Sequence, residues 1–238
     1  MKIVSLLVCL MLLASSGLAM GGPSPEIEEE GERAVKTIAG NKYLIDDFES
    51  GSLGSPRDWW TFDIQSAEIA SNDDLILGGE EVARNVGKYS VGLKGKAKNW
   101  YGGGIGTYVA KENQDLSNFN SFSVDIYGNG SGTAKIELYD DDNGNWQIEQ
   151  NREQNYKPLY DDKLVYDVVI DWKGWKNVSV LLDDFVDDNP GVGDDVWNPE
   201  QNGESGGLLQ LQIISLADEE TGKIDYNLDN IYLTVDEE

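Results

Sequence analysis

Histidine is absent from the 238-residue chain, and cysteine occurs once. Without an imidazole, neither a Ser-His-Asp or Cys-His mechanism nor a histidine-ligated zinc site can be built, whereas carboxylate chemistry and calcium binding remain open. Basic residues are also scarce, with 18 Lys and Arg against 44 Asp and Glu, which gives a net charge of −26. Tight binding to phosphate needs clustered Lys and Arg, so the composition argues against nucleic acid and anionic membrane as partners.

Long hydrophobic runs are missing except at the N-terminus. There, Lys2 precedes the apolar residues 3–14, and small residues follow up to Ala19. This pattern is typical of a cleaved secretory signal peptide, here residues 1–19, and the run is too short for a transmembrane helix. We therefore expect a secreted protein, extracellular, periplasmic or at the cell surface, whose mature chain does not insert into a membrane. The single cysteine, Cys9, lies within the run, so a mature chain of this kind has no disulfide.

The rest of the chain divides into a linker and one domain. Residues 20–41 contain two prolines and an acidic run, which predicts an acidic flexible linker. From residue 42 to residue 238, short segments of alternating polarity are separated by Gly, Asn and Asp, a pattern typical of β-strands. In the segment 121–127, for example, Phe122, Val124 and Ile126 share one face.

About ten short strands and no long helical period predict an all-β fold, a two-sheet antiparallel β-sandwich of the jelly-roll kind. The other predicted strands cover residues 44–48, 89–93, 104–109, 134–139, 164–171, 175–182, 208–216 and 224–235.

An acidic segment at 140–145 allows two interpretations. It resembles the start of a calcium loop, but Gly144 comes one position early and Asn151 stands where a bidentate Glu is needed. A hairpin turn at Asn143 and Gly144, leading into a strand at 146–149, is therefore the preferred prediction. The Gly- and Asp-rich residues 183–207 predict a long loop with a functional or ion-binding role.

Many of the aromatic residues are interleaved with Asp, Asn and Gln rather than with Leu and Val. Aromatic rings pack on the C–H face of a sugar, and acids and amides bind its hydroxyl groups. Tyr127 and Tyr139 are predicted to face away from the aliphatic side of their strands, beside Asp125 and Glu137. These residues predict an open groove for a sugar, although the alternative that most rings only cap the sandwich stays open.

Four phrases occur in order along the chain: LIDDFE at 44–49, DLSNFNSFSVDI at 115–126, GWKNVSV at 174–180 and LDNIYL at 228–233. Together they resemble a carbohydrate-binding module of the jelly-roll, galactose-binding-like kind, most similar to family 11, whose known members bind β-glucans. The resemblance covers residues 43–235, nearly the whole predicted mature chain.

This resemblance implies a metal and a cleft. It implies a structural calcium ion that joins the first and last strands through Glu49 and Asp229, with Asp47 as a further ligand. It also places Tyr166 and the pair Trp100 and Tyr101 in the binding cleft, with Leu216 standing where the family has a cleft tyrosine.

The sequence thus predicts a secreted, non-catalytic protein that recognises a polysaccharide or cell-surface glycan through an aromatic groove. Two alternatives remain: a structural or adhesive cell-surface protein that uses the fold for contacts with other proteins, and a glycosidase or lyase based on paired carboxylates. The predicted binding residues are Trp100, Tyr101, Asp125, Tyr127, Glu137, Tyr139 and Tyr166.

Overall fold

The computed structural model describes residues 38–39, 41–75, 86–110, 114–154, 156–202 and 205–236. The predicted signal peptide and most of the predicted linker lie outside these residues, while Ile38–Ala39, at the end of that linker, form strand β1. In the described part of the chain, no helix has the length and apolar character needed to cross a membrane.

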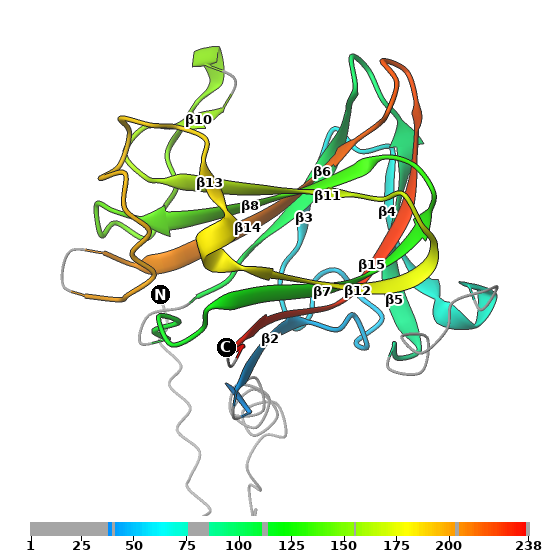
Figure 1. The fold of residues 1–238 in the computed structure, drawn as a ribbon, viewed down its shortest axis with the longest axis horizontal. Coiled ribbons are helices and arrows are strands. Elements are labelled where there is room, and N and C mark those ends of the chain that lie inside the picture. Colours follow the sequence, from blue (N-terminus) through cyan, green and yellow to red (C-terminus); the bar gives the residue numbers. More distant parts are fainter. Residues whose placement is uncertain are drawn as a thin grey trace, which may run out of the picture. The chain divides into compact units, whose positions relative to one another are not determined.

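Two antiparallel sheets pack face to face (Figure 1), which confirms the predicted sandwich. Sheet A contains β1, β2 (Lys42–Asp46), β4 (Ser66–Ser71), β5 (Tyr89–Lys96), β7 (Ser121–Asn129), β12 (Lys173–Leu181) and β15 (Lys223–Thr234). Sheet B contains, from one edge to the other, β13 (Val186–Asp187), β11 (Lys163–Val169), β8 (Thr133–Asp141), β14 (Gly207–Leu216), β6 (Tyr101–Tyr108) and β3 (Trp60–Phe62). The short strands β9 (Gln150–Asn151) and β10 (Lys157–Pro158) pair with each other. The described residues also form the 3-10 helices η1 (Asn72–Leu75), η3 (Arg152–Gln154) and η4 (Leu182–Asp184).

The core forms because successive side chains of a strand point to opposite faces of its sheet. Phe122, Val124 and Ile126 of β7 are buried between the sheets, as are Ile136 and Leu138 of β8. The inward faces predicted for these two strands are therefore confirmed. The residues that alternate with them on β8 point outward, where they line the site described below.

One strand, β15, joins the parts of sheet A. It pairs with β2 through Ile231 opposite Asp46, and Leu228 lies between Val91 of β5 and Ile126 of β7. The first long strand and the last strand of the domain are therefore neighbours, which brings the segment after β2 close to Asp229.

The hairpin predicted at Asn143 and Gly144 is wrong, because residues 146–149 form no strand. Strand β8 is already flanked by β11 and β14, so it has no open edge for a returning strand. The chain instead turns around the Asp141 carboxylate, which accepts hydrogen bonds from the backbone N–H groups of Gly144 at 2.9 Å and Trp146 at 2.7 Å.

Candidate functional site

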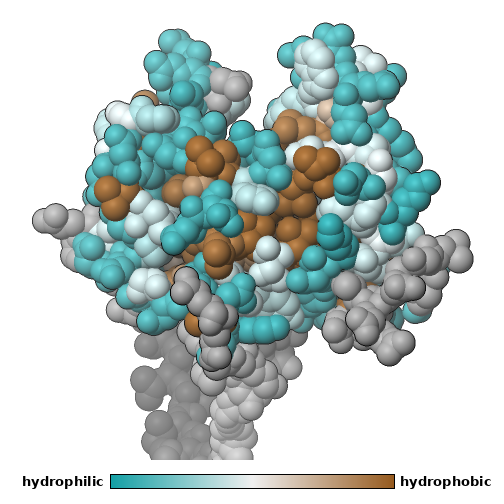
Figure 2. Space-filling model, viewed as in Figure 1, coloured by the Kyte–Doolittle hydropathy of each residue, from teal (hydrophilic) through white to brown (hydrophobic). Residues whose placement is uncertain are grey.

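A cleft of about 780 Å³ lies over the outer face of sheet B. Its floor is formed by outward-pointing residues of β3, β6, β8, β11 and β14. One wall carries Gln150 and Tyr156 from the β9–β10 segment, and the other carries Lys98 and Asn99 from the turn between β5 and β6. Figure 2 shows this hollow between two projecting, mostly hydrophilic lobes. In Figure 1, which has the same view, one lobe is the segment around β10, and the other consists of the turns between strands across the hollow from it.

The floor on the β3 side is aromatic. Trp60 and Phe62 of β3 pair with Gly106 and Gly104 of β6, so no side chain of β6 stands beneath the two rings. A methyl group added to Gly106 would lie 2.6 Å from the Trp60 indole, and one added to Gly104 would lie 2.8 Å from the Phe62 ring. The two glycines therefore let both rings lie against the strand and expose an apolar surface to the cleft.

The floor on the β11 side is ionic. The Lys163 ammonium lies 2.6 Å from Asp188 Oδ2 and 3.7 Å from Glu137 Oε1. Lys135 Nζ lies 3.9 Å from Asp188 Oδ2, which extends the ion pairs along the cleft. Because these side chains are partly buried, their donors and acceptors are held in place by one another rather than by bulk water.

Two tyrosine phenols are fixed by neighbouring carboxylates. The Tyr139 hydroxyl donates to Glu137 Oε2 at 2.6 Å, and burial, followed by the Glu137 charge, holds the pKa of this phenol well above its usual range. Tyr101 donates to Asp63 Oδ2 at 3.2 Å, and burial together with the Asp63 charge raises its pKa as well. Both phenols therefore stay protonated at neutral pH and orient the carboxylates beside them.

Between the aromatic and ionic sides runs β14, which contributes Gln212, Ile214 and Leu216. The Gln212 position lies opposite Glu137 on one side and Gly106 on the other. Across the sheet, the surface thus changes from rings through an amide to charged groups. Such a surface suits a ligand with an apolar face and several hydroxyl groups, because rings cover C–H groups while amides and charges bind oxygen.

Three of the seven predicted binding residues, Tyr101, Glu137 and Tyr139, line this cleft. Tyr139 is only 2% exposed, so its ring supports Glu137 rather than offering a stacking surface. Trp100 is half exposed at the end of the turn before β6, with a positive φ of 65°, and is not among the lining residues.

The other three predicted residues lie elsewhere. Asp125 is buried in sheet A, where its carboxylate accepts from Asn177 Nδ2 and Asn230 Nδ2, both at 2.8 Å. Tyr127, also in sheet A, packs edge-to-face on Trp175. Tyr166 packs against the core, 5.6 Å from the Phe185 ring. The structure therefore does not bring these residues together with Glu137 and Tyr139.

Sequence reasoning missed several of the lining residues. Trp60 and Phe62 are two positions apart, as are Gly104 and Gly106, so each pair shares one face of its strand. The two pairs are about 45 residues apart in the sequence, and no local pattern indicates that their strands are neighbours. Gln212 lies within the predicted strand 208–216, and Asp188 lies within the predicted long loop 183–207. Lys163 immediately precedes the predicted strand 164–171. Their positions were therefore accessible to prediction, but their convergence on one cleft was not.

The residues predicted to bind calcium lie near the β2 end of β15. Asn72 Nδ2 donates to Asp229 Oδ2 at 3.2 Å, and the backbone N–H of Tyr89 donates to Glu49 Oε1 at 2.8 Å. Burial raises the pKa of Asp229 to about 8, with smaller contributions from the charges of Asp125 and Glu49. Asn72 Oδ1 is buried without a partner, and a methyl group on Gly87 would overlap the Glu49 carboxylate. The carboxylates of Glu49 and Asp229 and the unpartnered Asn72 oxygen are all hard oxygen donors, the kind that calcium prefers.

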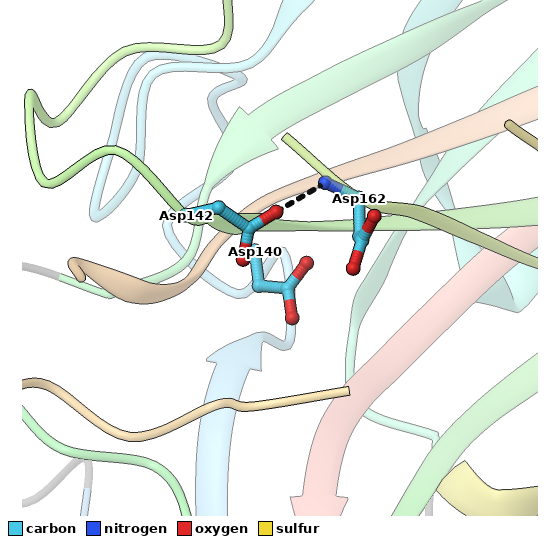
Figure 3. A group of neighbouring side chains, drawn as sticks. All are labelled: Asp140, Asp142 and Asp162. Carbon is cyan, nitrogen blue, oxygen red and sulfur yellow. Dashed lines mark hydrogen bonds between the residues drawn. The ribbon is translucent and has the colours of Figure 1, made fainter. Parts of the chain in front are cut away.

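The carboxylates predicted for that site are less tightly grouped than a second set. Among the described residues, Asp140, Asp142 and Asp162 form a group in which one carboxylate oxygen from each residue lies within 4.8 Å of the other two, so that the group could hold a metal ion (Figure 3). Asp47 instead uses Oδ1 to accept from the backbone N–H of Glu49 at 3.2 Å.

Comparison with known proteins gives similarity at the level of structure. No family model matches the chain, and no curated protein matches its sequence. The family 11 carbohydrate-binding module of a cellulosomal cellulase of Clostridium thermocellum is 18% identical, with a TM-score of 0.45 over 84% of this chain and 98% of the module. A family 11 module from the same organism, in complex with a β-1,3-1,4-mixed-linked tetrasaccharide, is 19% identical, with a TM-score of 0.45 over 83% of this chain and 98% of the module.

A carbohydrate-binding module of Caldicellulosiruptor saccharolyticus in complex with mannohexaose is 14% identical, with a TM-score of 0.43 over 84% of this chain and all of the module. An exo-β-agarase, at 16% identity and a TM-score of 0.45, is matched over 82% of this chain but only 25% of its own. The chain is thus similar in structure to carbohydrate-binding modules, and the family that its sequence phrases resemble is among them.

Proposed function

We propose that the protein is a non-catalytic carbohydrate-binding protein that holds a polysaccharide or oligosaccharide in the cleft of sheet B. One observation carries this proposal: the Trp60 and Phe62 rings lie against the glycines of β6 and face a row of charged and amide groups across the same floor. The cleft volume falls within the range of about 300–1,000 Å³ that is usual for ligand sites. A sugar ring that packs on the aromatic side would direct its hydroxyl groups toward Gln212, Glu137 and Lys163.

Two of the three carboxylates that line the cleft are paired with a lysine. Glycosidases place one acid and one base or nucleophile on the two sides of the scissile bond. Here Glu137 and Asp188 both contact the Lys163 ammonium, at 3.7 and 2.6 Å, on the β11 side of the cleft. A carboxylate oriented by an ion pair in this way can accept hydrogen bonds from the hydroxyl groups of a sugar.

Affinity gel electrophoresis on a panel of soluble polysaccharides tests the proposal. The panel contains mixed-linked β-1,3-1,4-glucan, mannan and xylan, and the variants are Trp60→Ala and a control, Tyr160→Ala. Tyr160 is 56% exposed and does not line the cleft. We expect retardation of the parent and of the control by at least one polysaccharide, and loss of retardation for Trp60→Ala.

The outcomes separate the candidate functions. Retardation that Trp60→Ala leaves unchanged would remove the cleft from the proposal. No retardation by any member of the panel would favour the structural or adhesive function instead. Release of reducing ends from any polysaccharide in the panel would favour a glycosidase or lyase.

The proposal includes secretion and a structural calcium ion. Secretion rests on the signal-peptide pattern of residues 1–19. Glu49, Asp229 and Asn72 would hold the ion, which would join the segment after β2 to β15 and neutralise a buried carboxylate. Calcium should then raise the melting temperature of the parent, and Asp229→Asn should reduce this rise. An equal rise in both proteins would contradict the site.

A further inference from the structure

The group of Asp140, Asp142 and Asp162 lies where three segments of the chain meet. Asp140 is near the end of β8, Asp142 follows that strand, and Asp162 immediately precedes β11. Residues 193–198 of the long loop pack against them, since the Val196 and Asn198 backbone N–H groups donate to the cluster. Figure 3 shows the three carboxylates converging on one small space.

Each of the three carboxylates uses one oxygen and leaves the other without a partner. Asp140 Oδ2 accepts from Asn198 N at 3.1 Å, Asp142 Oδ2 from Asp162 N at 2.9 Å, and Asp162 Oδ2 from Val196 N at 3.0 Å. The Oδ1 atom of each is buried and has no hydrogen-bond partner. Because Asp140 is fully buried and Asp162 is 2% exposed, unpaired carboxylate oxygens at these positions carry a large desolvation cost.

No protein cation offsets this charge. Among the described residues, no lysine or arginine forms an ion pair with any of the three aspartates. Burial, reinforced by the charges of Asp142 and Asp162, raises the pKa of Asp140 to about 8. Burial and the Asp162 charge likewise raise the pKa of Asp142 to about 7. Such shifts are expected where buried carboxylates face one another with no cation between them.

The surrounding backbone also leaves space for an ion. Gly193 has a positive φ of 77°, and a methyl group at this position would overlap both Asp162 Oδ1 and the Asp142 carboxylate. A side chain there would therefore fill the space between the two carboxylates. The glycine keeps that space open and lets the loop close over it.

We propose that Asp140, Asp142 and Asp162 bind a calcium ion that ties the end of β8 to the start of β11 and to the loop at 193–198. The spacing fits, because two oxygens on opposite sides of Ca²⁺ are about 4.6–5.2 Å apart when each bond is about 2.3–2.6 Å, and the three ligand oxygens lie within 4.8 Å of one another. All of these donors are hard oxygens, and Mg²⁺ requires shorter bonds and a stricter octahedral geometry than Ca²⁺ does, which favours Ca²⁺. Asn198, whose backbone N–H donates to Asp140, also has a buried side-chain oxygen, Oδ1, without a hydrogen-bond partner.

Calorimetric titration of the chelator-treated full chain with CaCl₂ tests the site. The variants are Asp162→Asn and Asp140→Asn, and the matched control is Asp183→Asn, an exposed aspartate of η4 outside the cluster. Each comparison is made in the parent and in an Asp229→Asn background, so that the calcium site proposed between the first and last strands does not contribute. We expect both cluster variants to bind one Ca²⁺ fewer per chain, and the control to bind as many as the parent.

Thermal melting without metal shows whether the variants fold. Because each substitution removes one of three repelling charges, the metal-free variants should melt at or above the metal-free parent and should lose the calcium-induced rise. Unchanged stoichiometry in both cluster variants would overturn the proposal. Binding of MgCl₂ to the same site with equal affinity would overturn the assignment to calcium.

Discussion

Gly106 controls the aromatic floor of the cleft, and Gly106→Ala tests that role directly. The added methyl carbon would lie 2.6 Å from the Trp60 indole. Carbon atoms pack at about 3.5–4.0 Å, so the ring has to withdraw by about 1 Å or more. Trp60 belongs to β3 at the edge of sheet B, where the ring can tilt outward without opening the core. The substitution should therefore disturb the sugar-binding surface and leave the fold intact.

The expected loss of affinity follows from the share of binding energy that an aromatic anchor supplies. Displacing such an anchor costs about 1–3 kcal/mol, which corresponds to a dissociation constant that rises roughly 5- to 150-fold. Calorimetric titration with the polysaccharide that retards the parent measures this change. The control is Gly95→Ala in β5, where the new methyl group would make ordinary contacts of 3.4 Å or more with Gln65.

The two glycine variants should differ in affinity and agree in stability. If Gly106→Ala binds as tightly as Gly95→Ala while Trp60→Ala loses binding, then the ring does not need to lie against β6, and the reasoning from the glycine is refuted. If Gly106→Ala lowers the melting temperature as well as the affinity, whereas Gly95→Ala lowers neither, then the loss of affinity reports unfolding rather than displacement of the ring.

Three further predictions concern other parts of the molecule. Lys163→Met should weaken polysaccharide binding about tenfold, or about 1.4 kcal/mol, because Glu137 and Asp188 lose the cation that orients them, and unchanged affinity in a calorimetric titration would contradict this. Tyr127→Ala should leave the affinity within about twofold of the parent, because Tyr127 lies in sheet A, and a larger loss in the same titration would place the sugar on that sheet. Arg57→Lys should lower the free energy of unfolding by about 2–3 kcal/mol, because the guanidinium donates to carbonyl oxygens of β2 and of the end of β6. An unchanged midpoint of urea unfolding would argue against that role.

The strands were predictable from the sequence because burial imposes a local period of two. The inward residues of β7 and β8 follow this alternation, and their burial confirms it. The sheet to which each strand belongs is not encoded locally. Tyr127 and Tyr139 have the same outward position in consecutive strands, yet β7 belongs to sheet A and β8 to sheet B, so the two rings lie on opposite sides of the sandwich. A groove that contains both cannot form.

The metal ligands proposed around the acidic segment after β8 could not be predicted from local sequence either. A local calcium loop needs all its ligands within about a dozen residues, and residues 140–151 lack the last one. The structure supplies a third carboxylate from Asp162, twenty residues after Asp142, because β11 pairs with β8 and starts beside its end. Long-range pairing of this kind cannot be deduced from residue spacing, although the prediction of an ion-binding role for residues 183–207 pointed to the loop that covers the cluster.

The position of β15 in sheet A also determines the order in which the domain can assemble. Of the described strands, β2, the β4–β5 pair and the β7–β12 pair are hydrogen-bonded into one sheet only through residues 223–234. A growing polypeptide that has not yet produced these residues holds three separate pieces of sheet A with no common partner. Because contacts so distant in sequence form late and slowly, stable folding has to wait for the last strand. Completion of sheet A is therefore a late step that follows synthesis of residues 223–234.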